Sequence, residues 1–199
     1  MNDSNLRADL AVIANLIHTG ERVLDLGCGD GELLRYLVDT HQVVGRGIEL
    51  SEAGVLASMH RGLSVRQGNL HEGLGDYPQG SFDSVILSQT LPYLNDLTFI
   101  FIEMLRVGKR VIVSFPNWGN WRCRLELLWD GRAPVAQDLP QPWYAAPRAR
   151  LLTIRDFEEF CEKNRFQITS QVFLKGEQRI PTHRDRSWRA TTAIYELKP

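Results

Sequence analysis

The sequence of 199 residues predicts an α/β fold, in which helices cover both faces of a mostly parallel β-sheet. Three observations predict it. Short apolar runs alternate with stretches at helical spacing, a glycine-rich turn joins the first such pair, and the length suits a single core. The expected strands are residues 22–26, 43–50, 63–69, 81–88 and 109–115.

The helices between these strands are marked by apolar spacing and by capping residues. Residues 6–17 place apolar side chains on one helical face, and Gly20 closes that helix. Ser51 can cap a helix after the second strand. The stretch 97–107 is so apolar that it must pack as a buried helix. Strands and helices that alternate in this way indicate βαβ units.

The C-terminal part follows another pattern. Thr153 followed by Asp156 is a near match to a capping box and opens one more helix. Residues 168–174 and 190–197 are expected to form a closing hairpin. The segment between them, 175–189, is polar and basic, and we expect a solvated loop there.

The composition shifts in residues 116–152, which hold four of the five tryptophans and five of the nine prolines. Residues 132–150 have no helical or strand period. A loop that long in a compact domain is usually a lid, a binding loop or a partner surface. We therefore expect a single domain over 1–199, with a Trp/Pro-rich lid or partner-binding insertion at about 116–152.

The tryptophans of this insertion have two interpretations. A helix expected at 121–129 places Trp121 and Trp129 on one face, and packing in the core is favoured for both. Trp118 and Trp143 stand near Gly or Pro in loops. For these two, core packing and a partner interface are equally favoured, because aromatic residues are enriched in both places.

Composition and charge disfavour several classes of protein. Basic and acidic residues number 23 and 24, a formal charge of −1, whereas a general binder of nucleic acid or of anionic membranes carries a basic excess. No apolar run reaches the ~18 residues that cross a bilayer. The three cysteines form no C-x-x-C pair, so no metal site is expected. We expect a cytoplasmic protein with no nucleic-acid or membrane partner.

The strongest motif is VLDLGCGDG at residues 23–31, where three glycines join a strand to a helix. Such a turn lets the backbone approach a ligand closely at the helix N-terminus. Glu49 ends the second strand, where a carboxylate can accept both ribose hydroxyls of a nucleoside cofactor. Glu32 stands where a dinucleotide fingerprint has its third glycine, which argues against an NAD site.

This glycine turn, the strand-ending Glu49 and the strand FDSVILS resemble class I S-adenosylmethionine (SAM) methyltransferases. The resemblance implies a three-layer, Rossmann-like fold with a seven-stranded, mostly parallel sheet whose last strand is antiparallel. It also implies a site for SAM or S-adenosylhomocysteine (SAH) over the carboxyl ends of the first strands. The contacts that it implies are Asp25, Gly27, Cys28, Gly29, Gly31, Glu49, Leu50, Asn69, Leu70 and Ser88.

Within this set, Asp25 and the glycine turn would line the methionine part of the cofactor, and Glu49 would bind the ribose. Asn69 occupies the position where the class usually has Asp for the adenine amino group. An amide oxygen can accept the same hydrogen bond.

No catalytic residue is recognisable. Methyl transfer depends mainly on holding the methyl group and its acceptor in line, so it needs few catalytic side chains. An N-P-P-Y tetrad is absent after the fourth strand, where residues 88–91 read SQTL. Each histidine stands alone and is expected to be solvated, although His71 lies nearest the cofactor site. One interpretation is a small-molecule methyltransferase, with its acceptor near Gln89, Tyr93, Asn117 and Trp118.

Residues 87–94, 103–128 and 139–161 resemble the MetW family of methionine-biosynthesis proteins, above all in VSFPNWGNWRCR. The resemblance implies association with a MetX-type homoserine O-acyltransferase, whose activity such proteins are thought to support. It implies no methyl acceptor, so whether the protein is itself an enzyme stays open. A SAM site without catalytic groups suggests that SAM tunes the partner. A nucleic-acid binder using the basic loop 179–189 is disfavoured by the net charge.

Overall fold

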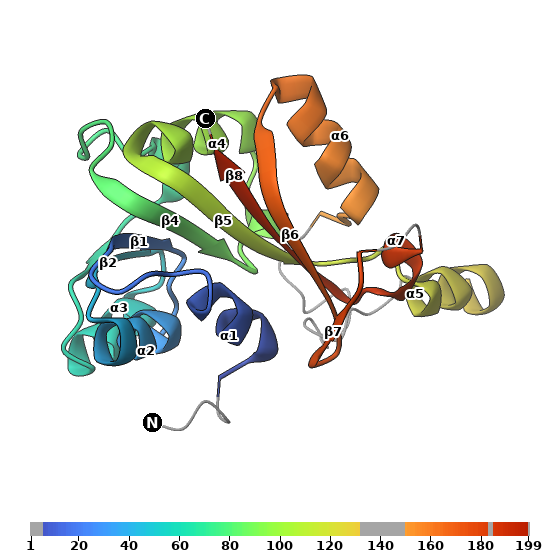
Figure 1. Cartoon of the computed structure of the whole chain (residues 1–199), viewed down its shortest axis with the longest axis horizontal. Coiled ribbons are helices and arrows are strands. Elements are labelled where there is room, and N and C mark those ends of the chain that lie inside the picture. The colour runs from blue at the N-terminus through green and yellow to red at the C-terminus, as the bar shows by residue number, and fades with distance from the viewer. Residues whose placement is uncertain (1–5, 132–149, 183–184, 199) are drawn as a thin grey trace.

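The computed structural model describes residues 6–131, 150–182 and 185–198. They form three layers, with one β-sheet between helices on its two faces (Figure 1). The strands are β1 (Arg22–Leu26), β2 (Val44–Glu49), β3 (Val65–Gln67), β4 (Phe82–Ser88), β5 (Gly108–Pro116), β6 (Gln167–Lys175), β7 (Gln178–Ile180) and β8 (Thr192–Lys198). The helices are α1 (Ala8–Ala14), α2 (Glu32–His41), α3 (Glu52–His60), α4 (Leu97–Val107), α5 (Trp121–Leu125), α6 (Ile154–Asn164) and α7 (Arg186–Arg189). Two 3-10 turns, η2 (Leu70–Glu72) and η3 (Leu91–Tyr93), and a π-helical turn, η4 (Glu126–Asp130), complete the elements of these ranges.

The sheet has the strand order β3-β2-β1-β4-β5-β8-β6-β7. The first five strands pair in parallel, and β8 runs antiparallel between β5 and β6. The mostly parallel sheet with an antiparallel strand near its edge is therefore confirmed, and so is the pairing of the two C-terminal strands. The described ranges hold eight strands rather than the seven expected.

The additional strand, β7, and the short helix α7 lie in the segment 175–189, for which the prediction of a plain solvated loop is wrong. β7 pairs antiparallel with β6 over three positions, from Phe173↔Ile180 to Lys175↔Gln178. Two of its three residues are exposed, so the strand is held by backbone hydrogen bonds at the sheet edge. It therefore leaves no apolar alternation in the sequence.

Two apolar clusters fill the two faces of the sheet. α4 and α6 cover one face, where the ring of Phe157 lies with its centroid 4.8 Å from those of both Phe115 and Tyr195. α1 and α2 cover the opposite face around Ile13 and Leu34, both fully buried (Figure 1). α1 is shorter than the predicted helix 6–17. Within the described ranges, no helix combines the length and the apolar character that a bilayer crossing requires.

The two predicted helix caps, Ser51 and Thr153, are confirmed. At α6 the Thr153 side chain accepts from the Asp156 backbone N–H at 3.2 Å, and the Asp156 carboxylate accepts from the Thr153 N–H at 3.0 Å. Ser51 caps α3 and Asp96 caps α4. These caps satisfy backbone donors that have no partner inside the helix.

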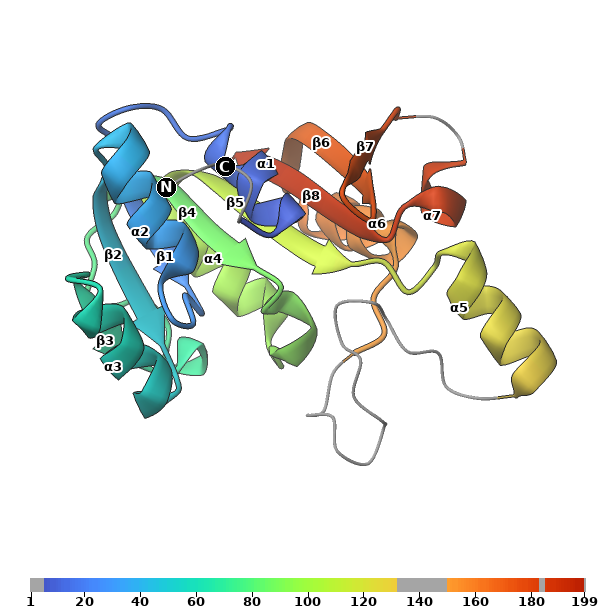
Figure 2. The same cartoon turned by 90° about the horizontal axis from the view of Figure 1, so that it is seen from below.

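The helix predicted at 121–129 forms as α5 and η4, but its apolar face is not packed along its length. Cys123 is buried and Trp121 partly buried, whereas Trp129 is 72% exposed. The core assignment of Trp129 is therefore wrong. The physical reason is the direction of the helix, which leaves the end of β5 and points away from the sheet (Figures 1 and 2). Trp143 lies outside the described residues.

A buried ionic cluster joins four elements at the end of the sheet opposite the glycine turn. Arg110 on β5 donates from Nη2 to Glu21 Oε1 at 2.8 Å and from Nη1 to Glu196 Oε2 at 3.3 Å. Its Nε donates to Ser84 Oγ at 2.8 Å, and Ser84 Oγ donates to Glu21 Oε2 at 2.6 Å. Burial alone would raise the pKa of Glu21, but hydrogen bonds from Ser84, His18 and Arg110 outweigh it and lower the pKa.

Replacing Arg110 with methionine is expected to lower the free energy of unfolding by about 3 kcal/mol, because two largely buried carboxylates lose their cation. Urea denaturation at neutral pH measures this loss. Arg155→Met, at an exposed position on α6, is the control and should change stability by less than about 0.5 kcal/mol.

The ion pair between Arg110 and Glu21 also predicts how the stability difference changes with pH. A carboxylate whose pKa is lowered by folding adds stability above its unfolded pKa, and this stability is lost as the pH falls. The difference between wild type and Arg110→Met should therefore shrink below about pH 4.3, the usual glutamate pKa. A difference that grows on acidification would contradict the role given to Glu21.

Candidate functional site

The glycine turn between β1 and α2 brings the backbone close to two neighbouring strands. Gly27 has φ +68°, and its N–H donates to the Ile48 carbonyl of β2 at 2.8 Å. A Cβ on Gly27 would lie 2.5 Å from Thr90 Oγ1, just beyond β4. A side chain at this position would thus collide with the next strand end as well as strain the backbone.

Gly31 is required for packing. It has φ +78° at the start of α2, and a Cβ there would collide with the Leu63 side chain and lie 2.8 Å from Ser58 Oγ. Gly31 lines neither of the two cavities described next.

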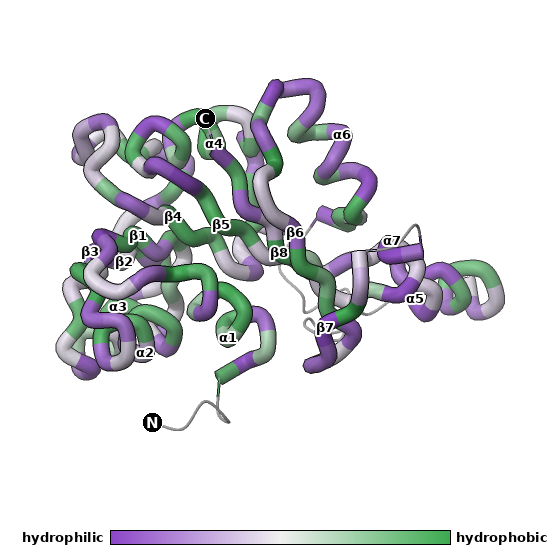
Figure 3. Tube along the Cα trace, viewed as in Figure 1, coloured by the Kyte–Doolittle hydropathy of each residue, from purple (hydrophilic) through white to green (hydrophobic). Residues whose placement is uncertain are grey.

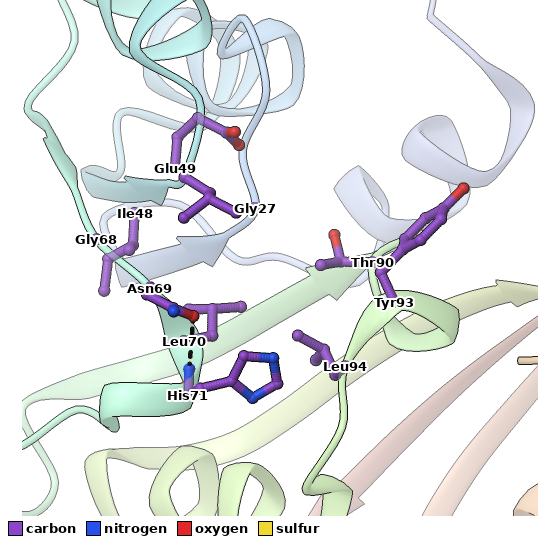
Figure 4. A pocket seen from close by; sticks show the side chains of 11 residues that line it. Gly27, Ile48, Glu49, Gly68, Asn69, Leu70, His71, Thr90, Tyr93 and Leu94 are labelled. Atoms are coloured by element: carbon purple, nitrogen blue, oxygen red, sulfur yellow. Dashed lines mark hydrogen bonds between the residues drawn. The ribbon is translucent and has the colours of Figure 1, made fainter. Parts of the chain in front are cut away.

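A cavity of about 330 Å³ opens beside the turn, at the carboxyl ends of the parallel strands (Figure 4). This is where open α/β sheets usually bind ligands. In Figure 4, Glu49 and Asn69 lie on one side of the cavity, and Thr90 and Leu94 on the other. The lining residues are Gly27, Ile48, Glu49, Leu50, Gly68, Asn69, Leu70, His71, Thr90, Tyr93 and Leu94.

A second cavity, of about 150 Å³, lies on the other side of the turn. Gly27 lines both cavities, so the two are neighbours and together suit an elongated ligand. The second cavity is more polar in its lining. Its residues are Arg7, Leu10, Asp25, Gly27, Cys28, Gly29, Asp30, Glu32, Leu33, Ser88 and Gln89.

The Glu49 carboxylate is held in place by the backbone. Its Oε2 accepts from the Gly29 N–H at 2.9 Å, and its Oε1 accepts from the Ser51 N–H at 2.8 Å. An ionised carboxylate offers about four lone-pair sites, so each oxygen can still accept another hydrogen bond. Glu49 is therefore a fixed acceptor at the edge of the larger cavity.

Asp25, by contrast, has a buried carboxylate that accepts no hydrogen bond from the described residues. Its side chain is 3% exposed, and no residue of the described ranges donates a hydrogen bond to it. Burial, followed by the charge of Glu49, raises the pKa of Asp25 to about 7, while the charge of Arg7 acts in the opposite direction. A buried acid of this kind favours a cationic or hydrogen-donating ligand.

The Asp9 carboxylate is equally buried but accepts several hydrogen bonds. It is 3% exposed and accepts hydrogen bonds from Arg7 Nε at 2.6 Å, Ser114 Oγ at 2.9 Å, Gln89 Nε2 at 3.1 Å and Ser88 Oγ at 3.2 Å. Burial would raise its pKa, but these bonds and the Arg7 charge lower it. The cluster fixes the start of α1 over the ends of β4 and β5, and it thereby places Arg7 in the wall of the smaller cavity.

Gln89, the residue after β4, has φ +56°. A non-glycine residue in this left-handed region is uncommon and often lies at a functional site. Its backbone N–H donates to the Ser114 carbonyl at 2.9 Å, and its side chain reaches Asp9. These two bonds hold the strained residue against the cavity.

The structure gathers nine of the ten residues implied by the methyltransferase resemblance around these two cavities. Glu49, Leu50, Asn69 and Leu70 line the larger one. Asp25, Cys28, Gly29 and Ser88 line the smaller one, and Gly27 lines both.

Asn69 has a local partner as well. Its Oδ1 accepts from the His71 N–H at 3.1 Å, which caps η2 (Figure 4). His71 lines the larger cavity with its side chain exposed. The remaining lone pair of the Asn69 oxygen is available to a ligand.

Asn117 and Trp118, expected near an acceptor, line neither cavity. Asn117 is 1% exposed, and its amide donates to the Ala190 carbonyl at 2.8 Å and to the Ser187 carbonyl at 2.9 Å. It holds the chain between β5 and α5 against the C-terminal segment, so its role is structural.

Sequence reasoning missed Arg7 and Asp9. They lie about eighty residues from Ser88 and Gln89, and acids near an N-terminus usually face solvent. The one available signal is local, since Asp9 immediately precedes the core residue Leu10 in a predicted amphipathic helix.

The fold is that of SAM-dependent methyltransferases. A solved methyltransferase of this class from Archaeoglobus fulgidus superposes with a TM-score of 0.70 at 16% identity, covering 100% of this chain and 95% of that one. Magnesium protoporphyrin IX methyltransferase from Synechocystis, solved with bound SAH, gives 0.65 at 18% identity, with 96% and 80% covered. At such identities the likeness shows the fold alone.

Sequence comparison is more specific. The chain is 33% identical over 204 residues to the bifunctional methionine biosynthesis protein MetXA/MetW of Rhodopirellula baltica. That alignment covers 97% of this chain and 33% of the relative, so the chain spans about a third of the relative's length. The family model described as methionine biosynthesis protein MetW matches residues 7–197. The chain therefore belongs to the MetW family.

Proposed function

We propose that this protein binds SAM and supports a MetX-type homoserine O-acyltransferase in methionine biosynthesis. The observation that carries the proposal is a cofactor-type cavity, built around the glycine turn, in a MetW chain. The name of the Rhodopirellula baltica relative joins MetXA and MetW in one protein. Fusion holds two modules at a high effective concentration, which favours a pair that acts together.

The residues of the two cavities fit the parts of SAM. The fixed carboxylate of Glu49 has acceptor capacity left for ribose hydroxyls. Asn69 offers an oxygen to the adenine amino group, with Leu50 and Leu70 beside it in the same cavity. Asp25, buried and with no hydrogen-bond donor among the described residues, suits the cationic methionine part of the cofactor.

SAM supplies an activated methyl group when bound, but the cavities offer little for catalysis. His71 and Tyr93 are the titratable side chains nearest a possible acceptor in the larger cavity. Burial raises the pKa of Tyr93, so its phenol stays protonated at neutral pH and is a poor general base. Since methyl transfer needs few catalytic side chains, the choice rests on the relative whose name joins MetXA and MetW, and we place a role in reading SAM concentration ahead of methyl transfer to a small molecule.

In this role SAM, made from methionine, would tune the first step of the pathway that produces it. A ligand shifts an equilibrium only through its different affinities for the two states. SAM must therefore bind the free protein and the acyltransferase complex with different dissociation constants. By reciprocity, SAM must change the affinity of the protein for its partner by the same factor.

Glu49→Gln is expected to weaken SAM binding by about ten- to a hundred-fold, because hydrogen bonds to a charged group contribute about 1.5–3 kcal/mol. Isothermal titration calorimetry with SAM measures the change. Glu52→Gln, three residues later at an exposed position on α3, is the control and should bind as the wild type does. Equal affinities for wild type and Glu49→Gln would remove Glu49 from the site.

SAM affinity should rise with pH between about pH 5.5 and 7.5, since the carboxylate of Asp25 must lose its proton to pair with a cation. The α-amino group of SAM keeps its own proton over most of this range. The slope is expected to vanish in Asp25→Asn, which binds weakly at every pH. Titrations at several pH values test this, and an unchanged slope in Asp25→Asn would assign the proton to another group.

The acyltransferase from the same organism should work several-fold faster when an equimolar amount of this protein is present. Acyl transfer to homoserine is measured with and without the protein, and then with added SAM. Glu49→Gln should retain the activation and lose the response to SAM, which separates partner binding from SAM binding.

No change in rate and no co-purification would contradict the partner proposal. Transfer of labelled methyl from SAM to a metabolite extract would then support a methyltransferase. Equal SAM affinity in the free and partnered protein would leave the activation intact and remove the regulatory role of SAM.

A further inference from the structure

The segment Trp121–Asp130 forms an arm, here called the helical arm, made of α5 and η4. It follows the end of β5 and points away from the sheet in both views (Figures 1 and 2). Among the described residues, its first turn contacts the body, where Cys123 is buried and Arg124 Nε donates to the Gly119 carbonyl at 2.6 Å. Its outer half is π-helical, a rare geometry that is frequent at functional sites.

Three consecutive large apolar side chains lie at the outer end of the helical arm. Leu127 is 59% exposed, Leu128 74% and Trp129 72%. In Figure 3 this end of the arm is coloured largely as hydrophobic. A run of exposed apolar residues is unfavourable in water and is retained where it serves a contact. The other exposed large apolar residues of the described ranges stand singly or in pairs three residues apart, on α3 (Leu56, Met59) and on α4 (Phe99, Ile102), and none of them forms a run of three consecutive residues.

A basic hollow lies at the root of the helical arm. It has a volume of about 200 Å³ and is lined by Asn120, Trp121, Arg122, Lys175, Gly176, Arg189 and Thr191. Three of these seven residues are cations and none is an acid. Arg189 has one acidic neighbour, Asp185, at 3.5 Å.

Aromatic rings hold two arginines of this region. The guanidinium of Arg122 lies 5.5 Å from the centre of the Trp121 ring, and that of Arg124 lies 5.3 Å from the Trp188 ring. Arginine and tryptophan are the residue types that contribute most to protein interfaces. Stacking limits the motion of the side chain and leaves the guanidinium edges free to bind carboxylates.

We propose that the helical arm is the element that docks on the acyltransferase, so this inference rests on the proposed function. Leu127, Leu128 and Trp129 enter an apolar recess of the partner, and carboxylates beside that recess enter the basic hollow. The partner surface is thus specified by its chemistry, an apolar recess with acidic residues on one side.

Charge favours a different protein over a second copy of this chain as the occupant. In a symmetric dimer the same patch meets itself, so two arms side by side would bring two basic hollows close together. Like charges across an interface are unfavourable, whereas opposite charges speed association and fix its register. The overall charge of −1 means that the excess of cations is local to this patch.

The test compares the affinities of variants for the purified acyltransferase by biolayer interferometry. Leu128→Ser with Trp129→Ser should weaken binding by about tenfold or more, because central aromatic anchors dominate interface energies. Leu56→Ser with Met59→Ser is the matched control, since these α3 side chains are 51% and 57% exposed. The control should bind like the wild type, and both double variants should keep the wild-type SAM affinity and melting temperature.

A second pair of variants tests the basic hollow. Arg122→Glu with Lys175→Glu should weaken binding and flatten its dependence on salt, because screened attraction is lost. Arg155→Glu on α6 is a charge reversal at an exposed position away from the hollow and should leave binding unchanged.

The outcomes separate the two proposals. If the wild type binds the acyltransferase and the arm variants bind equally well, the docking arm is overturned and the partner role stands. If the wild type does not bind at all, the partner role fails and the docking arm with it. Light scattering tests a third outcome, in which the wild type is a dimer and Leu128→Ser with Trp129→Ser is a monomer. If that double variant also binds the acyltransferase as tightly as the wild type does, the arm is a contact between copies and the inference is overturned.

Discussion

The close approach of the glycine turn to its neighbouring strands is the constraint on which the site depends. Gly27 is bonded to the Ile48 carbonyl and has no space for a side chain beside Thr90. The next turn residue, Gly29, donates to Glu49 at 2.9 Å and accepts from Ser58 Oγ at 3.1 Å. The turn thus aligns three strand ends and α3 at once, and both cavities are walled by it.

Three acidic side chains of the fold differ in the number of hydrogen-bond donors around them. Glu21 and Asp9 are surrounded by donors, and in each the hydrogen bonds outweigh the effect of burial on the pKa. Asp25 is as buried as Asp9 but has no donor from the described residues, so its pKa moves upward. A folded chain retains such an acid at a cost in stability, since a buried group without a partner is unfavourable. This contrast is the reason why Asp25 is proposed as the acid that a ligand completes.

Much of the fold could be predicted because its signals are local. Among the parallel strands, β4 and β5 contain continuous apolar runs at 85–87 and 111–113, and the Thr153 cap and the glycine turn use residues whose conformational reasons are known. Three features could not. β7 has only Ile180 packed against the core and is otherwise held by backbone pairing, the Asp9 cluster joins residues far apart in the chain, and the exposure of Trp129 follows from the direction in which its helix leaves the sheet.

Arg7 belongs to two hollows at once. It lines the smaller cavity beside Asp25, and it also lines a hollow of about 220 Å³ that contains Gly176 and Thr191, residues that line the basic hollow as well. The smaller cavity and the basic hollow are therefore connected through one intervening hollow, which shares Arg7 with the first and Gly176 and Thr191 with the second. A shift of the Arg7 side chain changes the walls of the smaller cavity and of the intervening hollow, and the intervening hollow shares Gly176 and Thr191 with the basic hollow.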